Sequence, residues 1–130
     1  MIKSLALSFC FLCMSITSMA QVVDTLTSVK VYEMLTSCEY TTRIIDGRDS
    51  AKFYSGHLKN AVYIDAFSDQ AVPFLTKYLN EDCIIIYCTN KTRSLLLIDK
   101  LKEINYQGKI LYMQDGITGW KKNGYRIEMW

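Results

Sequence analysis

Short apolar runs alternate along the chain with stretches of helical periodicity, and this alternation constrains the fold more than any other feature. Apolar side chains recur at helical spacing in residues 28–37, 68–79 and 94–104. Runs of strand length lie at residues 43–45, 61–64, Cys83–Tyr87 and Lys109–Met113. Residues 22–23 would add a short edge strand. This alternation predicts an α/β fold, with a mostly parallel sheet of four to five strands and helices on both faces.

Turns or polar residues follow three of these predicted strands. A turn at residues 46–48 follows the first, another at residues 115–116 follows the last, and Cys88 follows the third. The third run is apolar at every position, which is typical of a strand buried on both faces. The carboxyl ends of parallel strands share one edge, where ligand sites of open α/β sheets gather. We therefore expect Cys88 to lie on the functional edge.

Residues 1–20 have the features of a signal peptide. Lys3 gives a short basic start, an apolar stretch covers residues 5–16, and small residues precede a cleavage point after Ala20. The apolar stretch is about a dozen residues long, whereas a membrane-spanning helix needs about 20. We expect an exported protein, periplasmic or secreted, with no stable membrane insertion after cleavage. Residues 21–130 would form a single domain.

The mature chain has almost no net charge. The full sequence holds 15 basic and 13 acidic residues, and removal of Lys3 leaves 14 against 13, a balance of +1. The basic residues form no cluster or stripe. Proteins that bind nucleic acid concentrate lysine and arginine on one face, so the sequence excludes nucleic acid as a partner.

Three of the five cysteines remain after cleavage, because Cys10 and Cys13 lie in the signal peptide. Three is an odd number, so at least one thiol stays unpaired within the monomer. Cys83 and Cys88 cannot pair, since five residues of strand separate them by about 16 Å, and a disulfide needs Cα atoms within about 7 Å. Cys38 and Cys83 precede or open strands at the opposite sheet edge. They could pair there and leave Cys88 as the sole thiol.

A polar loop follows Cys88 and supplies the candidate site residues. If the strand ends at Tyr87 and a helix begins near Arg93, the backbone between them can curl into a nest of N–H groups that binds anions. The N-terminus of the helix adds partial positive charge, which stabilises a thiolate. Cys88 would then be a catalytic nucleophile. The candidate substrate-binding residues are Thr89, Asn90, Lys91, Thr92, Arg93 and Ser94.

A core role is the alternative for Cys88, because cysteine is among the most buried residue types. Its position at the end of a strand, before five polar residues, favours the reactive role. Lys91 and Arg93 would attract an oxyanion, Arg93 through a fork that can bind two oxygens at once.

Four short motifs occur in order between about residues 43 and 127. The loop that begins at Cys88 has a cysteine, four intervening residues and an arginine, and residues 44–48 end a strand in Asp-x-Arg. Residues 56–64 read Gly-His-Leu-x-x-Ala-x-x-Ile, and residues 115–120 read Asp-Gly-x-x-x-Trp. In this order and spacing the motifs resemble those of the rhodanese-like sulfurtransferases.

The resemblance implies a mechanism that runs through a persulfide on Cys88. The thiolate would take the sulfane sulfur of a donor such as thiosulfate or a persulfide and pass it to a thiol or cyanide acceptor. These small molecules are the expected partners, and the resemblance implies no metal and no other cofactor. Asp46 and Arg48 would support the site as a turn and ion pair, with substrate contact as the alternative. The resemblance gives His57 a structural turn and not the role of a base.

Three positions differ from the pattern of active family members. Thr89 stands where arginine is frequent and Lys91 where glycine is frequent, which weakens the case for thiosulfate. Asp115 replaces the first glycine of the last motif. A non-catalytic binding or sulfur-carrier module is the main alternative to a sulfurtransferase. A cysteine-based phosphatase or arsenate reductase is a further alternative, although the active loop of the phosphatases is one residue longer.

Overall fold

The sheet contains five strands in residues 21–37 and 41–129, the part of the chain that this computed structural model describes. The strands are β1 (Val23–Leu26), β2 (Thr42–Asp46), β3 (Ala61–Tyr63), β4 (Cys83–Tyr87) and β5 (Lys109–Met113). The helices are α1 (Ser28–Ser37), α2 (Ser50–Ser55), α3 (Ala71–Thr76), α4 (Lys91–Glu103) and α5 (Gly116–Lys122). The strand order is β1-β5-β4-β2-β3 and every neighbouring pair is parallel, which confirms the predicted α/β class.

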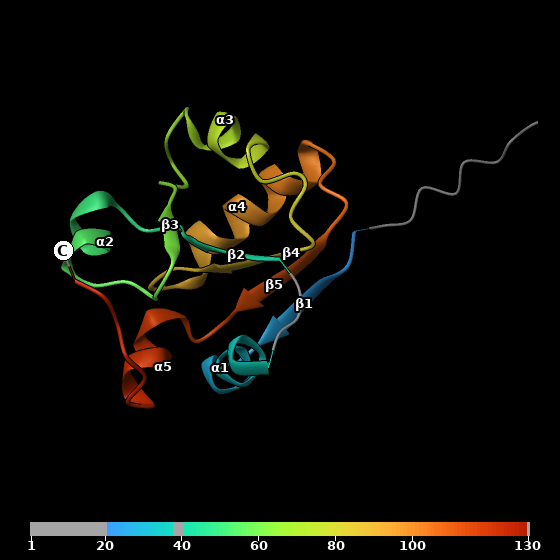
Figure 1. The fold of residues 1–130 in the computed structure, drawn as a ribbon. Coiled ribbons are helices and arrows are strands. Elements are labelled where there is room, and N and C mark those ends of the chain that lie inside the picture. Colours follow the sequence, from blue (N-terminus) through green and yellow to red (C-terminus); the bar gives the residue numbers. More distant parts are fainter. Residues whose placement is uncertain (1–20, 38–40, 130) are drawn as a thin grey trace, which may run out of the picture.

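The direction in which the chain crosses the sheet decides which face each helix covers. From β1 to β2 and on to β3 the chain moves one way, and from β3 through β4 to β5 it moves back. Right-handed crossovers then require α1 on one face and both α3 and α4 on the other. Figure 1 shows this arrangement, with α5 beside α1 and with α2 beyond the end of the sheet.

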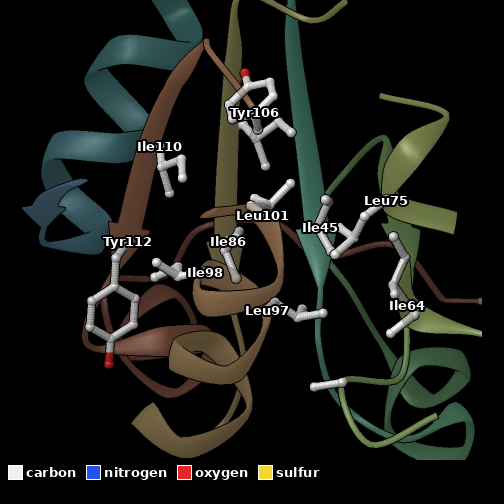
Figure 2. Close-up of a cluster of buried hydrophobic side chains, with 13 residues drawn as sticks. Ile45, Ile64, Leu75, Ile86, Leu97, Ile98, Leu101, Tyr106, Ile110 and Tyr112 are labelled. Atoms are coloured by element: carbon white, nitrogen blue, oxygen red, sulfur yellow. The ribbon is translucent and has the colours of Figure 1, made fainter. Parts of the chain in front are cut away.

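Side chains of β4 alternate between the two faces and divide the core into two clusters. Ile84 and Ile86 belong to the cluster between the sheet and helices α3 and α4. Figure 2 shows Ile86 together with Leu97 of α4 in this cluster. Ile85 points to the opposite face and packs with residues of α1 and α5 that include Trp120. All five residues of β4 are buried, as expected for the central strand of a parallel sheet.

The structure differs most from the sequence prediction at three elements. β1 covers Val23–Leu26 and not residues 22–23 alone, and it pairs with β5 over its full length. α4 begins at Lys91, several residues early, because Asn90 caps the helix by accepting a hydrogen bond from the Thr92 amide. α3 is shorter than the predicted 68–79, since tight turns precede and follow it.

Several predictions concern residues outside the described part of the chain. The signal peptide at residues 1–20 and the cysteine at 38 lie there, so export and the pairing of Cys38 with Cys83 stay predictions. Cys83 itself opens β4 and is buried. Across residues 21–37 and 41–129, every helix is too short or too polar to cross a membrane.

Candidate functional site

The candidate site lies where β2 and β4 end side by side. The two strands are neighbours, with Asp46 paired with Tyr87 at their carboxyl ends. After β2 the chain turns toward β3, and after β4 it turns the opposite way toward β5. In open α/β sheets the usual ligand site is the crevice outside the carboxyl ends of strands whose continuations diverge in this way. Cys88 is the first residue beyond β4, so it stands at the carboxyl edge of the sheet, as predicted.

The thiol of Cys88 is enclosed and has a hydroxyl partner. Ser94 Oγ donates a hydrogen bond of 3.0 Å to Cys88 Sγ. Cys88 is 2% exposed and Ser94 is fully buried, so the pair is shielded from water. Ser94 therefore gives the sulfur a hydrogen-bond donor that water does not replace.

Among the described residues, the Ser94 hydroxyl is the one hydrogen-bond donor to Sγ. One amide of the expected nest, that of Thr92, is occupied by the Asn90 side chain. Anion binding by the rest of the loop stays a prediction. The sulfur nevertheless lies just before the N-terminus of a 13-residue helix, where the helix dipole stabilises negative charge.

The start of α5 covers the backbone of Cys88. The Ile117 amide donates to the Cys88 carbonyl oxygen at 3.1 Å. Gly116 has a φ of 57°, and a side-chain carbon at this position would collide with that same carbonyl oxygen. Glycine is therefore required here for both its conformation and its lack of a side chain.

The four residues between Cys88 and Arg93 form the solvent side of the loop. Thr89, Asn90, Lys91 and Thr92 are all exposed. Lys91 is an exposed cation three residues after the buried Cys88, and its attraction of an oxyanion stays a prediction.

Arg93 has an intramolecular partner, whereas the sequence analysis assigned its fork to a substrate oxyanion. Its Nη1 lies 2.6 Å from Oδ1 of Asp65 and 3.3 Å from the carbonyl oxygen of Gly47. Its guanidinium also lies over the ring of Phe67, at 4.5 Å from the ring centre. Arg93 thus joins the loop after β4 to the segments that follow β2 and β3.

Asp46 and Arg48 form a buried ion pair at the carboxyl end of β2. Arg48 Nη2 lies 2.6 Å from Asp46 Oδ2, and the same nitrogen donates to the Gly56 carbonyl at 2.6 Å. The Tyr87 hydroxyl donates to Asp46 Oδ2 at 2.7 Å and accepts from the Leu58 amide at 3.1 Å. These contacts agree with the expected turn and ion pair, the first of the two roles considered for Asp46 and Arg48.

Burial and charge act together in this network. Burial opposes the charge on Arg48, but the hydrogen bonds and charge of Asp46 outweigh it and raise the pKa of Arg48 above its usual value. Burial, followed by the charge of Asp46, raises the pKa of Tyr87 well above its usual range. Tyr87 therefore stays protonated and donates to the carboxylate over the whole physiological range.

His57 is buried and holds the C-terminal segment. Its ring stacks on Phe53 with 4.1 Å between ring centres, and Nδ1 lies 3.0 Å from the Phe53 carbonyl oxygen. Its backbone pairs with Glu128 through two hydrogen bonds of 2.8 and 2.9 Å. These contacts agree with the turn role expected for His57, which directly follows Gly56 at the end of α2.

Asp115, which replaces a family glycine, has a structural task. Its two carboxylate oxygens accept from the backbone N–H and the hydroxyl of Ser28 at 2.7 and 2.6 Å. Asn123 Nδ2 donates to the same hydroxyl at 2.9 Å. Asp115 therefore joins the loop after β5 to the beginning of α1.

Sequence reasoning missed Asp65 and Phe67 as residues of this edge. Both follow β3, and the carboxyl end of β3 lies beside that of β2. Both residues lie just after a predicted strand. The same rule that placed Cys88 at this edge could therefore have predicted them.

Two further features of the described residues lie apart from this site. No group of three or more His, Cys, Asp or Glu side chains in them could hold a metal ion. An open hollow of about 660 Å³ is lined by Lys59, Arg126, Ile127, Glu128 and Met129, and includes none of the loop that follows β4.

Solved structures with the same fold support this arrangement. A rhodanese-like domain from Anabaena has 18% identity and a TM-score of 0.68, over 85% of this chain and 79% of that one. A rhodanese-like domain protein from Staphylococcus aureus has 20% identity and a TM-score of 0.67, over 82% and 98%. A thiosulfate sulfurtransferase from Pseudomonas aeruginosa has 17% identity and a TM-score of 0.69, over 82% of this chain but 20% of that enzyme. At these identities the likeness establishes the fold.

Sequence comparison extends the match to the family level. No curated protein is significantly similar to the chain. The family model of the rhodanese-like domain matches residues 27–123, from the residue before α1 to the residue after α5. With this match, the parallel sheet and the position of Cys88 after its central strand, the chain belongs to the rhodanese-like domain family.

Proposed function

We propose that this rhodanese-like domain is a sulfurtransferase that carries a sulfane sulfur on Cys88. The observation that carries the proposal is the 3.0 Å hydrogen bond from Ser94 to Cys88 Sγ at the start of α4. A hydrogen-bond donor beside the sulfur and a position at the N-terminus of a helix are features of nucleophilic cysteines. The family includes sulfurtransferases, and a thiosulfate sulfurtransferase shares the fold.

The proposed reaction has two half-reactions that need no oxidant or reductant. The Cys88 thiolate attacks the outer sulfur of the donor, the donor S–S bond breaks, and its electron pair leaves with sulfite or with a thiolate. An acceptor, cyanide or a thiolate, then attacks the terminal sulfur of the Cys88 persulfide. The S–S bond of the Cys88 persulfide breaks, and its electron pair stays on Cys88. The thiolate is thereby restored, as in other covalent catalysis by cysteine.

A donor has to pass the exposed side of the loop to reach the sulfur. Cys88 is 2% exposed, while Thr89, Asn90, Lys91 and Thr92 all face solvent. The proposed access route is therefore a displacement of these residues, and Lys91 supplies an exposed charge that attracts anions to the entrance.

The burial of Cys88 also favours a second candidate function, a non-catalytic binding or sulfur-carrier module. In such a module the thiol would stay closed to small donors, and Arg93 would stabilise the fold through Asp65. The two candidates differ in one observable property, which is whether a small sulfane donor reaches Cys88.

Export is part of the same proposal, because the first twenty residues have the pattern of a signal peptide. N-terminal sequencing of protein recovered outside the cytoplasm is expected to begin at Gln21. An N-terminus at Met1 in that fraction would contradict this part.

Intact mass measured without reductant tests the sulfurtransferase directly. Incubation with thiosulfate, or with cysteine persulfide, should add the mass of one sulfur atom to the wild type. Cys88→Ser should add none, whereas Cys83→Ala, a matched change at the other end of β4, should still add it. If neither donor adds sulfur to the wild type, the sulfurtransferase is contradicted and the binding module is favoured.

A further inference from the structure

Asp65 forms an ion pair with the guanidinium of Arg93. The carboxylate follows β3 and meets the guanidinium at 2.6 Å, with side-chain exposures of 28% for Asp65 and 22% for Arg93. The pair is therefore partly shielded, and its attraction is stronger than that of a fully exposed ion pair. It lies at the sheet edge that carries Cys88.

The same carboxylate oxygen also positions an aromatic ring. Asp65 Oδ1 accepts from the Phe67 amide at 3.0 Å, which fixes the turn after β3. Phe67 is 61% exposed, although it is a large apolar side chain, and its ring covers one face of the Arg93 guanidinium. One face of the guanidinium and its Nη1 are thus taken by residues of the chain itself.

The charges around Arg93 are balanced before a substrate arrives. Asp65 pairs with it directly, and the nearby carboxylate of Asp49 has its own cation, Lys52, at 3.6 Å. The exposed Lys91 is a point charge in water and lacks the planar fork that binds two oxygens of a sulfonate. A dianion such as thiosulfate would have to compete with Asp65 for Arg93.

We infer that Asp65 is a specificity-determining residue, which makes the site disfavour dianionic donors such as thiosulfate and favour persulfides of small thiols. This inference rests on the proposed sulfurtransferase function. A persulfide donor has no sulfonate group for Arg93 to bind. The ion pair between Asp65 and Arg93 therefore does not weaken the binding of a persulfide donor. Its leaving group is a thiolate and not sulfite.

The favoured first half-reaction is balanced in atoms and charge. The Cys88 thiolate attacks the outer sulfur of R–S–SH, a new S–S bond forms on Cys88, and the S–S bond of the donor breaks. The electron pair leaves on the thiolate R–S⁻, and the proton stays with the transferred sulfur.

The test compares loading rates of Cys88 from two donors, followed by intact mass. Asp65→Asn removes the charge but keeps an acceptor for the Phe67 amide, so the turn is retained. Thiosulfate should load this variant at least about fivefold faster than the wild type, because one unit charge about 4 Å away is worth about 1 kcal/mol even at the dielectric of water. Loading from cysteine persulfide should change less than about twofold, because its ammonium and carboxylate groups cancel in charge and leave no dianion for Arg93 to attract.

Two controls separate this charge effect from others. Asp65→Glu keeps the charge and should load from thiosulfate at the wild-type rate. Asp69→Asn removes an exposed carboxylate of the same segment and should change neither rate. If Asp65→Asn does not fold, Asp65→Ser, which also keeps a hydrogen-bond acceptor, takes its place.

The outcomes distinguish this inference from the function on which it rests. An unchanged or lower thiosulfate rate in Asp65→Asn, with persulfide loading intact, overturns the role of Asp65 alone. A wild type that accepts sulfur from neither donor overturns the sulfurtransferase and this inference with it.

Discussion

The hydroxyl of Ser94 lies 3.0 Å from the sulfur of Cys88, and both side chains are removed from solvent. The two residues are brought together by one turn of backbone, since the helix begins at Lys91, between them. In a buried site a single hydroxyl donor has a large effect on an anion, because water is not there to replace it. This contact is the local feature on which the proposed chemistry depends.

Replacement of Ser94 by alanine is expected to slow alkylation of Cys88 at neutral pH. A hydrogen bond to a charged group is worth about 1.5–3 kcal/mol, which corresponds to a decrease of about tenfold or more. Alanine is smaller than serine and does not restrict the access of iodoacetamide to Cys88. A lower alkylation rate therefore reports the lost hydrogen-bond donor. The measurement is the iodoacetamide rate of the peptide that contains Cys88, resolved by mass spectrometry.

Ser55→Ala is the control, because the Ser55 hydroxyl is exposed and bonds to the Lys52 carbonyl instead of to sulfur. It should leave the alkylation rate unchanged. An unchanged or faster rate in Ser94→Ala would show that the hydroxyl does not stabilise the thiolate.

Tyr87→Phe is expected to destabilise the fold by about 1–3 kcal/mol, because the buried Asp46 carboxylate loses a donor and the Leu58 amide loses its acceptor. Urea unfolding, with an unchanged slope against denaturant, measures the loss. Tyr54→Phe removes the hydroxyl of an exposed tyrosine and should have no effect beyond error. Equal stability of the two variants would mean that the Asp46 network contributes nothing.

Gly116→Ala and Gly124→Ala separate backbone strain from collision. Both glycines have positive φ, 57° and 74°, so alanine at either position costs about 1–2 kcal/mol from conformation alone. A side chain at 116 would also meet the Cys88 carbonyl oxygen, whereas one at 124 meets no atom within 4 Å. Gly116→Ala should therefore be the less stable variant in urea unfolding and should also impair sulfur loading. Equal effects would contradict the contact between α5 and Cys88.

The stability of the fold should fall at alkaline pH. Burial is the main cause that raises the pKa of Tyr87 and of Tyr106 well above the value of about 10 in the unfolded chain. The unfolded state therefore binds fewer protons above about pH 10. The contribution of each buried tyrosine is complete below that pH and declines above it, at up to about 1.4 kcal/mol per pH unit.

Urea unfolding between pH 8 and 11 tests this dependence. The difference in stability between the wild type and Tyr87→Phe should be constant below about pH 10 and shrink above it. A difference that stays constant or grows above this range would show that Tyr87 ionises as readily in the folded state as in the unfolded chain.

The central features of the fold could be predicted because local sequence and sheet geometry agree. The run Cys83–Tyr87 is apolar at every position and occupies the centre of the sheet, buried on both faces. Strand ends in a parallel sheet share an edge, which placed Cys88 at this edge without knowledge of any contact.

The start of α4 could have been predicted more closely. Asn90 is a favourable N-cap residue, and its side chain accepts from the Thr92 amide. The helix was expected to begin near Arg93, two residues after its actual start at Lys91.

The partner of Arg93 could not be predicted from local sequence. Asp65 is 28 residues away, and the two meet only because β2 lies between β3 and β4 in the sheet. A long arginine side chain at a helix start can reach toward a ligand or across the sheet edge, and its direction depends on which carboxylates the tertiary structure brings near. The burial of Cys88 likewise involves α5, whose first residues pack on its carbonyl.

A single-turnover transfer tests the central claim most directly. Protein loaded with one sulfur on Cys88 is freed of donor and mixed with cyanide, and thiocyanate is measured together with intact mass. The account predicts one equivalent of thiocyanate, loss of one sulfur from the protein, and a thiol on Cys88 that can be loaded again. Sulfur that stays on the protein, or a Cys88→Ser variant that yields the same thiocyanate, would contradict transfer through Cys88.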